Sequence, residues 1–177
     1  MPDELSTKSL AIKDLLFSRI MMHRYGRVHC YIPLSTKQEV DTRPIIDTLI
    51  QDFPSQIFIP KVQKGGELTH HLYDPIIPLK TNQWGIEEPV NEGISSKEFF
   101  ETDEDILVIV PLLAFDKTGH RVGYGKGFYD RFLRFKQSET LLVGLSFFEA
   151  LEEPLASEAT DIALNHVVTP KRIYGFG

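Results

Sequence analysis

The chain has 177 residues, of which 42% are hydrophobic and 25% charged, as is typical of a globular protein with a full core. Its 25 acidic and 19 basic side chains give a net charge of −6, which argues against non-specific nucleic-acid binding because phosphate backbones favour a basic surface. A single cysteine excludes an internal disulfide, and the most apolar run, residues 106–115, is too short to span a membrane. We therefore expect one cytoplasmic domain over residues 1–177, a monomer or weak homo-oligomer, with no nucleic-acid or membrane partner.

The amino-terminal half of the sequence alternates between helical and strand patterns. Apolar residues recur at helical spacing in its first segment, and alternating polar and apolar residues mark the strands. Cys30 falls in the first predicted strand, where we expect it to belong to the core rather than to act as a nucleophile. The predicted elements are a helix over residues 5–22, a strand over 27–33, a helix over 43–52, a strand over 56–62, and a turn followed by a strand over 65–74.

The carboxyl-terminal half begins with a long surface excursion and then continues the alternation of strands and helices. Residues 105–115, DILVIVPLLAF, are apolar on both faces, as a central parallel strand must be. The predicted elements are the excursion over 75–98, a strand over 105–115, a helix over about 126–137, and strands over 140–147, 165–170 and 172–176. This order predicts an α/β fold, a three-layer open, mostly parallel sheet with helices on both faces.

A glycine-rich segment, GHRVGYGKGFYDRF at residues 119–132, follows the most apolar strand. In open parallel sheets, ligands bind beyond the carboxyl ends of the strands, where we expect this segment to lie. Backbone N–H groups exposed by Gly123, Gly125 and Gly127, together with Lys126, predict an anion site at the start of the next helix. A tight connection whose glycines serve only packing is the alternative.

Two familiar glycine motifs do not fit this segment. A Walker loop needs a glycine six positions before the lysine and a Ser or Thr directly after it, but the required glycine is absent and Gly127 follows Lys126. A dinucleotide fingerprint that starts at Gly123 needs a glycine at position 128, where Phe128 stands. The segment is therefore a candidate for phosphate binding of another type.

Two further residues, one inside this segment and one before it, suggest ligand contacts. Asp130 lies three residues after Gly127, and Mg²⁺ prefers one or two carboxylates together with phosphate oxygens. Interaction with the helix dipole is the alternative role for this aspartate. Trp84, in the long excursion, can stack on a flat ligand or hold the loop in place, and the residues alone favour neither.

Residues 110–133, VPLLAFDKTGHRVGYGKGFYDRFL, closely resemble the signature of the 5-formyltetrahydrofolate cyclo-ligase family. The resemblance extends over about residues 5–173, since further pieces occur in the family's order. These pieces are CYIPLSTKQEVDT (30–42), PKVQKGGEL (60–68), QWGIEEPV (83–90) and ATDIALNHVVTP (159–170).

The resemblance implies a reaction in folate one-carbon metabolism that depends on ATP and Mg²⁺. It closes 5-formyltetrahydrofolate to 5,10-methenyltetrahydrofolate, and ADP and phosphate are released. A formamide oxygen is a poor leaving group, so transfer of the γ-phosphoryl group of ATP to that oxygen would activate the formyl carbon for attack by N10. Catalysis of phosphoryl transfer is mostly positioning and charge neutralisation.

The resemblance also assigns roles to residues, with Lys126 and Arg121 as the expected catalytic side chains. The expected ATP-binding residues are Arg121, Val122, Gly123, Tyr124, Gly125, Lys126, Gly127, Phe128 and Tyr129. The expected substrate-binding residues are Leu34, Glu39, Trp84, Tyr124, Gly125, Lys126, Gly127 and Phe128. The expected Mg²⁺ ligands are Asp130 and Asp161.

The beginning of the chain departs from the family pattern. Family members usually start with an extra basic segment that helps to hold ATP, and here the first helix aligns with the family's second one. We therefore expect weaker ATP binding, unless the start of the sequence is truncated or misassigned. Two alternatives remain open: a catalytically weak or inactive relative that binds nucleotide or folate, and a different enzyme of similar fold that acts on a sugar phosphate.

Overall fold

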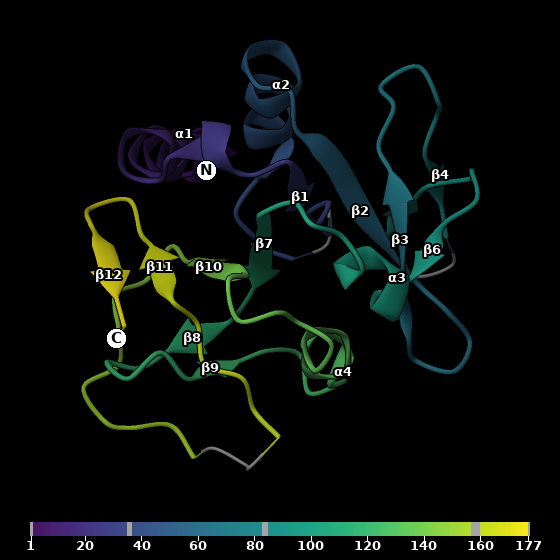
Figure 1. The fold of residues 1–177 in the computed structure, drawn as a ribbon. Coiled ribbons are helices and arrows are strands. Elements are labelled where there is room, and N and C mark those ends of the chain that lie inside the picture. Colours follow the sequence, from purple (N-terminus) through teal and green to yellow (C-terminus); the bar gives the residue numbers. More distant parts are fainter. Residues whose placement is uncertain (1, 35–36, 83–84, 157–159, 177) are drawn as a thin grey trace.

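The computed structural model describes residues 2–34, 37–82, 85–156 and 160–176, and among them eight strands form one central sheet (Figure 1). Five neighbouring strands, in the order β11, β10, β7, β1 and β2, run parallel. At one side β12 pairs antiparallel with β11, and at the other β3 pairs antiparallel with both β2 and β6. The strands are β1 (Arg27–His29), β2 (Gln56–Val62), β3 (Leu68–Leu72), β6 (Ile94–Ser95), β7 (Ile106–Pro111), β10 (Leu141–Leu145), β11 (His166–Val168) and β12 (Ile173–Gly175). The predicted α/β fold with a mostly parallel sheet is confirmed.

Helices cover both faces of the sheet, so the molecule has three layers (Figure 1). The longer helices lie on one face, and the shorter ones lie on the other. The helices are α1 (Pro2–Arg19), α2 (Arg43–Asp52), α3 (Ser96–Phe100) and α4 (Phe128–Leu133), with a 3₁₀ turn at Met22–Arg24. In the described part of the chain, no helix combines the length and apolar character needed to cross a bilayer.

Strand β7 shows why this sequence produces two cores. Leu107 and Ile109 pack in the core beneath α1 and α2, whereas Ile106, Val108 and Val110 pack in the core beneath α3 and α4. All five side chains are almost completely buried. A strand buried on both faces has no polar side, which explains the unbroken apolar run.

The prediction of one strand over residues 105–115 is wrong at its carboxyl end. The chain leaves the sheet after Pro111 and forms a separate hairpin of β8 (Ala114–Phe115) and β9 (Arg121–Val122). Asp116 fixes the turn of this hairpin, because its carboxylate accepts hydrogen bonds from the N–H groups of Thr118 at 2.8 Å and His120 at 3.1 Å. Burial alone would raise the pKa of Asp116, but these and other hydrogen bonds lower it to about 2.

Two predicted segments differ from the structure in extent or content. The helix predicted over about 126–137 comprises only Phe128–Leu133, since Gly125 and Gly127 have φ angles of 72° and 64°, which are not helical. The predicted excursion over 75–98 contains a small hairpin of β4 (Lys80–Thr81) and β5 (Glu87–Glu88), strand β6 and the start of α3.

The first predicted helix is shifted towards the amino terminus. It runs from Pro2 to Arg19 rather than over residues 5–22. Ile12 and Leu16 are fully buried on its inner face, whereas Leu10 is 43% exposed. The helix thus buries one face against the sheet, although its boundaries differ from the predicted ones.

Candidate functional site

A pocket opens at the carboxyl ends of β1, β7 and β10, where a ligand site was expected. It encloses about 400 Å³, counting the part that is open to solvent. Its walls come from the loop after β1, the ends of β7 and β10, and the glycine-rich segment. The lining residues are Tyr31, Gln38, Glu39, Val40, Pro111, Leu112, Leu113, Tyr124, Leu145, Ser146, Phe147 and Phe148.

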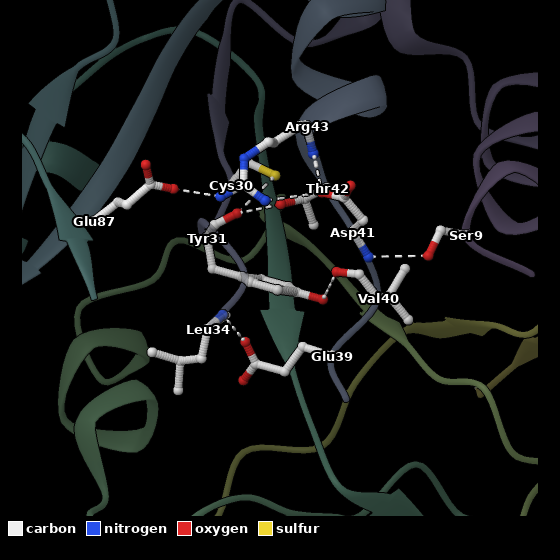
Figure 2. Close-up of polar contacts among 10 residues, drawn as sticks. All are labelled: Ser9, Cys30, Tyr31, Leu34, Glu39, Val40, Asp41, Thr42, Arg43 and Glu87. Carbon is white, nitrogen blue, oxygen red and sulfur yellow. Dashed lines mark hydrogen bonds and ion pairs between the residues drawn. The ribbon is translucent and has the colours of Figure 1, made fainter. Parts of the chain in front are cut away.

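The loop after β1 is held by a set of hydrogen bonds from its own residues and from α1 (Figure 2). The Tyr31 hydroxyl donates to the Val40 carbonyl at 3.3 Å, and the Thr42 hydroxyl donates to the Tyr31 carbonyl. The Asp41 N–H donates to the buried Ser9 hydroxyl of α1 at 3.0 Å. These bonds fix both ends of the loop that carries one wall of the pocket.

Three of the predicted substrate-binding residues meet at this wall. The Leu34 N–H donates to Glu39 Oε2 at 2.7 Å (Figure 2). Tyr124 reaches the same carboxylate from the glycine-rich segment: burial, and then its hydrogen bond to Glu39, raises the pKa of the Tyr124 phenol. Lys37, which the sequence interpretation missed, places its ammonium 5.7 Å from the centre of the Tyr124 ring. The only sequence signal for Lys37 was its place in the loop between Leu34 and Glu39.

A further ion pair brings the β4–β5 hairpin to the start of α2. Arg43 Nη2 pairs with Glu87 Oε2, and Arg43 Nη1 lies 3.4 Å from Asp41 Oδ1 (Figure 2). The hairpin therefore lies near the base of the loop after β1. Trp84, the remaining predicted substrate contact, lies outside the described residues.

Cys30 has no chemical role in this pocket. Its side chain is completely buried, and burial raises the pKa of its thiol to about 12. A thiol with such a pKa is not ionised near neutral pH. The expectation that Cys30 belongs to the core is confirmed.

The glycine-rich segment forms a loop between β9 and α4. An added Cβ would meet nothing within 4 Å at Gly123 or Gly125, and Tyr124, Gly125 and Lys126 are exposed. The backbone is therefore open to a ligand, as predicted, although the β8–β9 hairpin separates the loop from β7. The helix that follows has only six residues, so the expected contribution of its dipole is small.

Arg121 joins two segments that contain predicted metal ligands. Its Nη2 lies 2.6 Å from Asp130 Oδ1, and its Nη1 donates to the Ile162 carbonyl at 2.5 Å. The ion pair is largely shielded, since the Arg121 side chain is only 6% exposed. The segment with Asp161, which is exposed, therefore lies beside Asp130. Among the residues that the structure describes, no group of three or more His, Cys, Asp or Glu side chains is arranged to hold a metal ion.

The other side chains predicted to bind ATP differ in whether they face solvent or the interior. Val122 is exposed on β9, and Phe128 lies under the guanidinium of Arg131 at 5.6 Å. The Tyr129 hydroxyl points into the interior, where no described residue forms a hydrogen bond with it, and burial raises the pKa of its phenol. Tyr129 therefore faces the core side of α4 rather than the open side of the loop.

The sequence and the fold are similar to those of one family of known proteins. A profile of the 5-formyltetrahydrofolate cyclo-ligase family matches residues 1–170. The 5-formyltetrahydrofolate cyclo-ligase of Escherichia coli is 33% identical over 144 residues, which cover 80% of this chain and 77% of that protein. The 5-formyltetrahydrofolate cyclo-ligase of Saccharomyces cerevisiae is 31% identical over 183 residues, which cover 94% of this chain and 86% of that protein.

Solved structures show the same fold. The NMR structure of Aquifex aeolicus 5,10-methenyltetrahydrofolate synthetase aligns with a TM-score of 0.78 and 30% identity, over 99% of this chain and 84% of that one. A 5,10-methenyltetrahydrofolate synthetase from Mycoplasma pneumoniae aligns with a TM-score of 0.71 at 18% identity, a likeness of fold alone. On the match of the family profile, the curated relatives and the shared fold, the chain belongs to the 5-formyltetrahydrofolate cyclo-ligase family.

Proposed function

We propose that the protein catalyses the ATP-dependent closure of 5-formyltetrahydrofolate to 5,10-methenyltetrahydrofolate, with release of ADP and phosphate. The observation that carries this proposal is the meeting of Leu34, Glu39 and Tyr124 at a pocket that borders the open glycine loop. One side of this arrangement suits a flat, polar-edged ring, and the other suits phosphates. The reaction needs both ligands next to each other.

Glu39 would orient the folate. The Leu34 N–H holds one carboxylate oxygen at 2.7 Å, so the side chain is positioned before the ligand arrives. A carboxylate accepts hydrogen bonds only, and the pterin edge carries several N–H donors, so the two are complementary. Tyr124 lies beside the same carboxylate in the pocket lining, so it connects the Glu39 side of the pocket with the glycine loop.

The glycine loop and Lys126 would orient ATP. The exposed backbone around Gly125 offers N–H donors to phosphate oxygens, and the exposed ammonium of Lys126 adds a mobile positive charge. The γ-phosphoryl group moves to the formyl oxygen, N10 attacks the formyl carbon, and the C–O bond then breaks with release of phosphate and loss of the N10 proton. The protein's part in such a transfer is to position the groups and neutralise charge.

Asp130 and Asp161 fit the carboxylate chemistry that Mg²⁺ prefers, with phosphate oxygens and water completing its shell. Arg121 Nη2 forms an ion pair with Asp130 Oδ1, so Asp130 would bind the ion through its second carboxylate oxygen. Mg²⁺, when bound, would neutralise part of the phosphate charge. Arg121 would keep the two acidic segments together, through its bonds to Asp130 and to the Ile162 carbonyl.

The alternatives from the sequence are not favoured. The curated relatives described above are named as cyclo-ligases, which gives no support to an inactive binder or to an enzyme of sugar phosphates. We would test the proposal by measuring ADP release with MgATP in the presence of 5-formyltetrahydrofolate, of folic acid, and of a sugar phosphate. Release only with 5-formyltetrahydrofolate supports the proposal. Binding of this folate without ADP release supports the inactive relative, and release with the sugar phosphate supports the other enzyme.

A further inference from the structure

Phe148 is a large apolar side chain that the fold leaves in solvent at the mouth of the pocket. It is 68% exposed, and it shares the rim with Leu113 and Tyr124, which are 47% and 38% exposed. Single exposed apolar residues are common on protein surfaces and need no explanation. Here three exposed apolar side chains, two of them aromatic, line one pocket, and this indicates a surface that a ligand covers.

The backbone of Phe148 is held in place by the buried Ser146 hydroxyl. Ser146 Oγ accepts a hydrogen bond from the Phe148 N–H at 3.0 Å and lies 2.9 Å from the Phe148 carbonyl, to which it donates. Ser146 is itself fixed to the sheet, since its N–H donates to the Val168 carbonyl at 3.0 Å. The turn after β10 thus presents the Phe148 side chain in a defined place.

The chain is held equally firmly on the other side of Phe148. The Glu149 carboxylate accepts hydrogen bonds from Thr169 Oγ1 at 3.0 Å and from the Tyr174 hydroxyl at 2.8 Å, and Arg172 Nε lies 3.1 Å away. The Leu151 N–H donates to the Phe115 carbonyl of β8 at 2.8 Å. An aromatic ring on a fixed backbone has only two side-chain torsions to order, so it can bind at a small entropic cost.

We propose that Phe148 binds the benzoyl ring of the folate substrate at the mouth of the pocket. This inference rests on the proposed function. Glu39, which is half-buried, suits the pterin edge, so the rest of the folate must leave the pocket over its exposed rim. The benzoyl ring is attached to N10, the atom that attacks the formyl carbon.

The kinetic test compares Phe148→Ala with Phe148→Tyr, which keeps the ring. Loss of an aromatic contact of this kind is worth on the order of a tenfold rise in KM for 5-formyltetrahydrofolate. The kcat should stay nearly constant, because the ring contact exists in both the ground state and the transition state. Phe148→Tyr should keep the wild-type KM. Met21→Ala is the control: Met21 is 61% exposed and precedes β1, at the amino ends of the parallel strands, and this variant should change neither constant.

Three results would overturn the inference. The KM for the folate could be unchanged in Phe148→Ala, it could be raised in Phe148→Tyr as much as in Phe148→Ala, or Phe148→Ala could raise the KM for ATP instead of the KM for the folate. The last result would assign the ring to adenine. A second probe, 5-formyltetrahydropterin without the benzoyl group, should bind wild type and Phe148→Ala equally in calorimetry, and unequal binding would contradict the assignment to the benzoyl ring.

Calorimetry with 5-formyltetrahydrofolate separates this inference from the proposed function. If the wild-type protein binds this folate without turnover, the proposed function is refuted. Weaker binding of the folate by Phe148→Ala than by wild type would then still support the contact with the benzoyl ring, and equal binding would refute it. Wild type that does not bind the folate refutes both.

Discussion

Lys126 stands alone among glycines on an exposed loop, so its side chain can be removed without disturbing a core. We expect Lys126→Ala to keep its circular-dichroism spectrum and melting temperature and to lose about 10²–10³-fold in kcat, since one preorganised charge contact to a transferring group is typically worth that much. Lys97→Ala is a matched control, because Lys97 is 71% exposed on α3. A kcat for Lys126→Ala within a factor of two of wild type would remove Lys126 from the catalytic residues.

Asp130 and Asp161 differ in their surroundings, although the proposed function gives them one ion. We expect Asp130→Asn and Asp161→Asn each to raise the Mg²⁺ concentration needed for half-maximal ADP release. The losses should be less than additive in the double variant, because both act on the same ion. Arg121 pairs with Asp130, so the melting temperature of each variant must be measured in parallel. Strictly additive losses would indicate that the two carboxylates act independently.

At the scale of elements, Arg131 connects the glycine loop to the turn between β2 and β3. Its Nη2 donates to the Gly66 carbonyl at 2.6 Å and to the Lys126 carbonyl at 3.0 Å. Both Gly66 and Gly127 have positive φ, and a Cβ on either would come within 3.0 Å of the guanidinium. These glycines allow the arginine to approach the backbone, and Arg131 thereby fixes the carboxyl end of a loop that is otherwise little packed.

We expect Arg131→Lys to raise KM for ATP by about tenfold, because an ammonium cannot reproduce the planar fork and loses at least one hydrogen bond. The KM for 5-formyltetrahydrofolate should change much less, since Glu39 and its loop are untouched. Arg134→Lys is the control, because Arg134 is exposed at the end of α4 and stacks on Phe135. Equal changes in both KM values, or equal effects of the two variants, would show that Arg131 does not position the ATP side.

The elements that could be predicted from the sequence are those whose pattern is set by burial. The run of apolar residues in β7 has no polar side because both of its faces are covered, and the glycines at 125 and 127 indicated an open loop. The start of α3 was also visible in the sequence, since Ser95 and Glu98 form a capping box, but it was overlooked within the excursion.

Other features depend on contacts that no local pattern contains. The length of α4 and the β8–β9 hairpin follow from where the chain leaves the sheet after Pro111. Leu34 and Glu39 were identified only through the family resemblance, and Lys37 and Phe148 were missed. Whether an isolated lysine or phenylalanine faces a pocket or solvent is decided by residues far away in the chain.

For the whole molecule, the core beneath α4 makes stability depend on pH. His29 and His70 are completely buried beside each other, with ring centres 5.1 Å apart, and Phe132 lies against both. Burial lowers the pKa of His70 to about 3, and burial together with the neighbouring imidazole lowers the pKa of His29 well below its usual value. Both rings are therefore neutral in the folded state at pH 5.

The sign of the effect follows from proton uptake by the unfolded chain. In the unfolded chain a histidine has a pKa near 6.5, so below this pH the unfolded state binds a proton. The folded state does not bind this proton until the pH falls to about the folded pKa. Stability is full above pH 6.5 and falls as the pH is lowered. For His70, with its folded pKa of about 3, the loss from pH 7 to pH 5 is about 2 kcal/mol.

Urea denaturation at pH 7 and pH 5 checks this expectation. The unfolding free energy of wild type should fall between the two values by about 2 kcal/mol more than that of His70→Phe, which cannot take up the proton. Unfolded carboxyl groups titrate near pH 4, so they contribute little in this window. An equal fall in both proteins would contradict the neutral, buried state of His70.

The central claim is that the pocket and the glycine loop together close the folate ring. The most direct measurement is the absorbance of the methenyl product when wild type, Lys126→Ala and Glu39→Gln are each mixed with 5-formyltetrahydrofolate and MgATP. We predict rapid product formation by wild type, a greatly reduced kcat in Lys126→Ala, and a raised KM for the folate in Glu39→Gln, about ten- to a hundredfold for a lost bond to a charged group. No methenyl product from folded wild-type protein, or normal kinetics in both variants, would contradict the account.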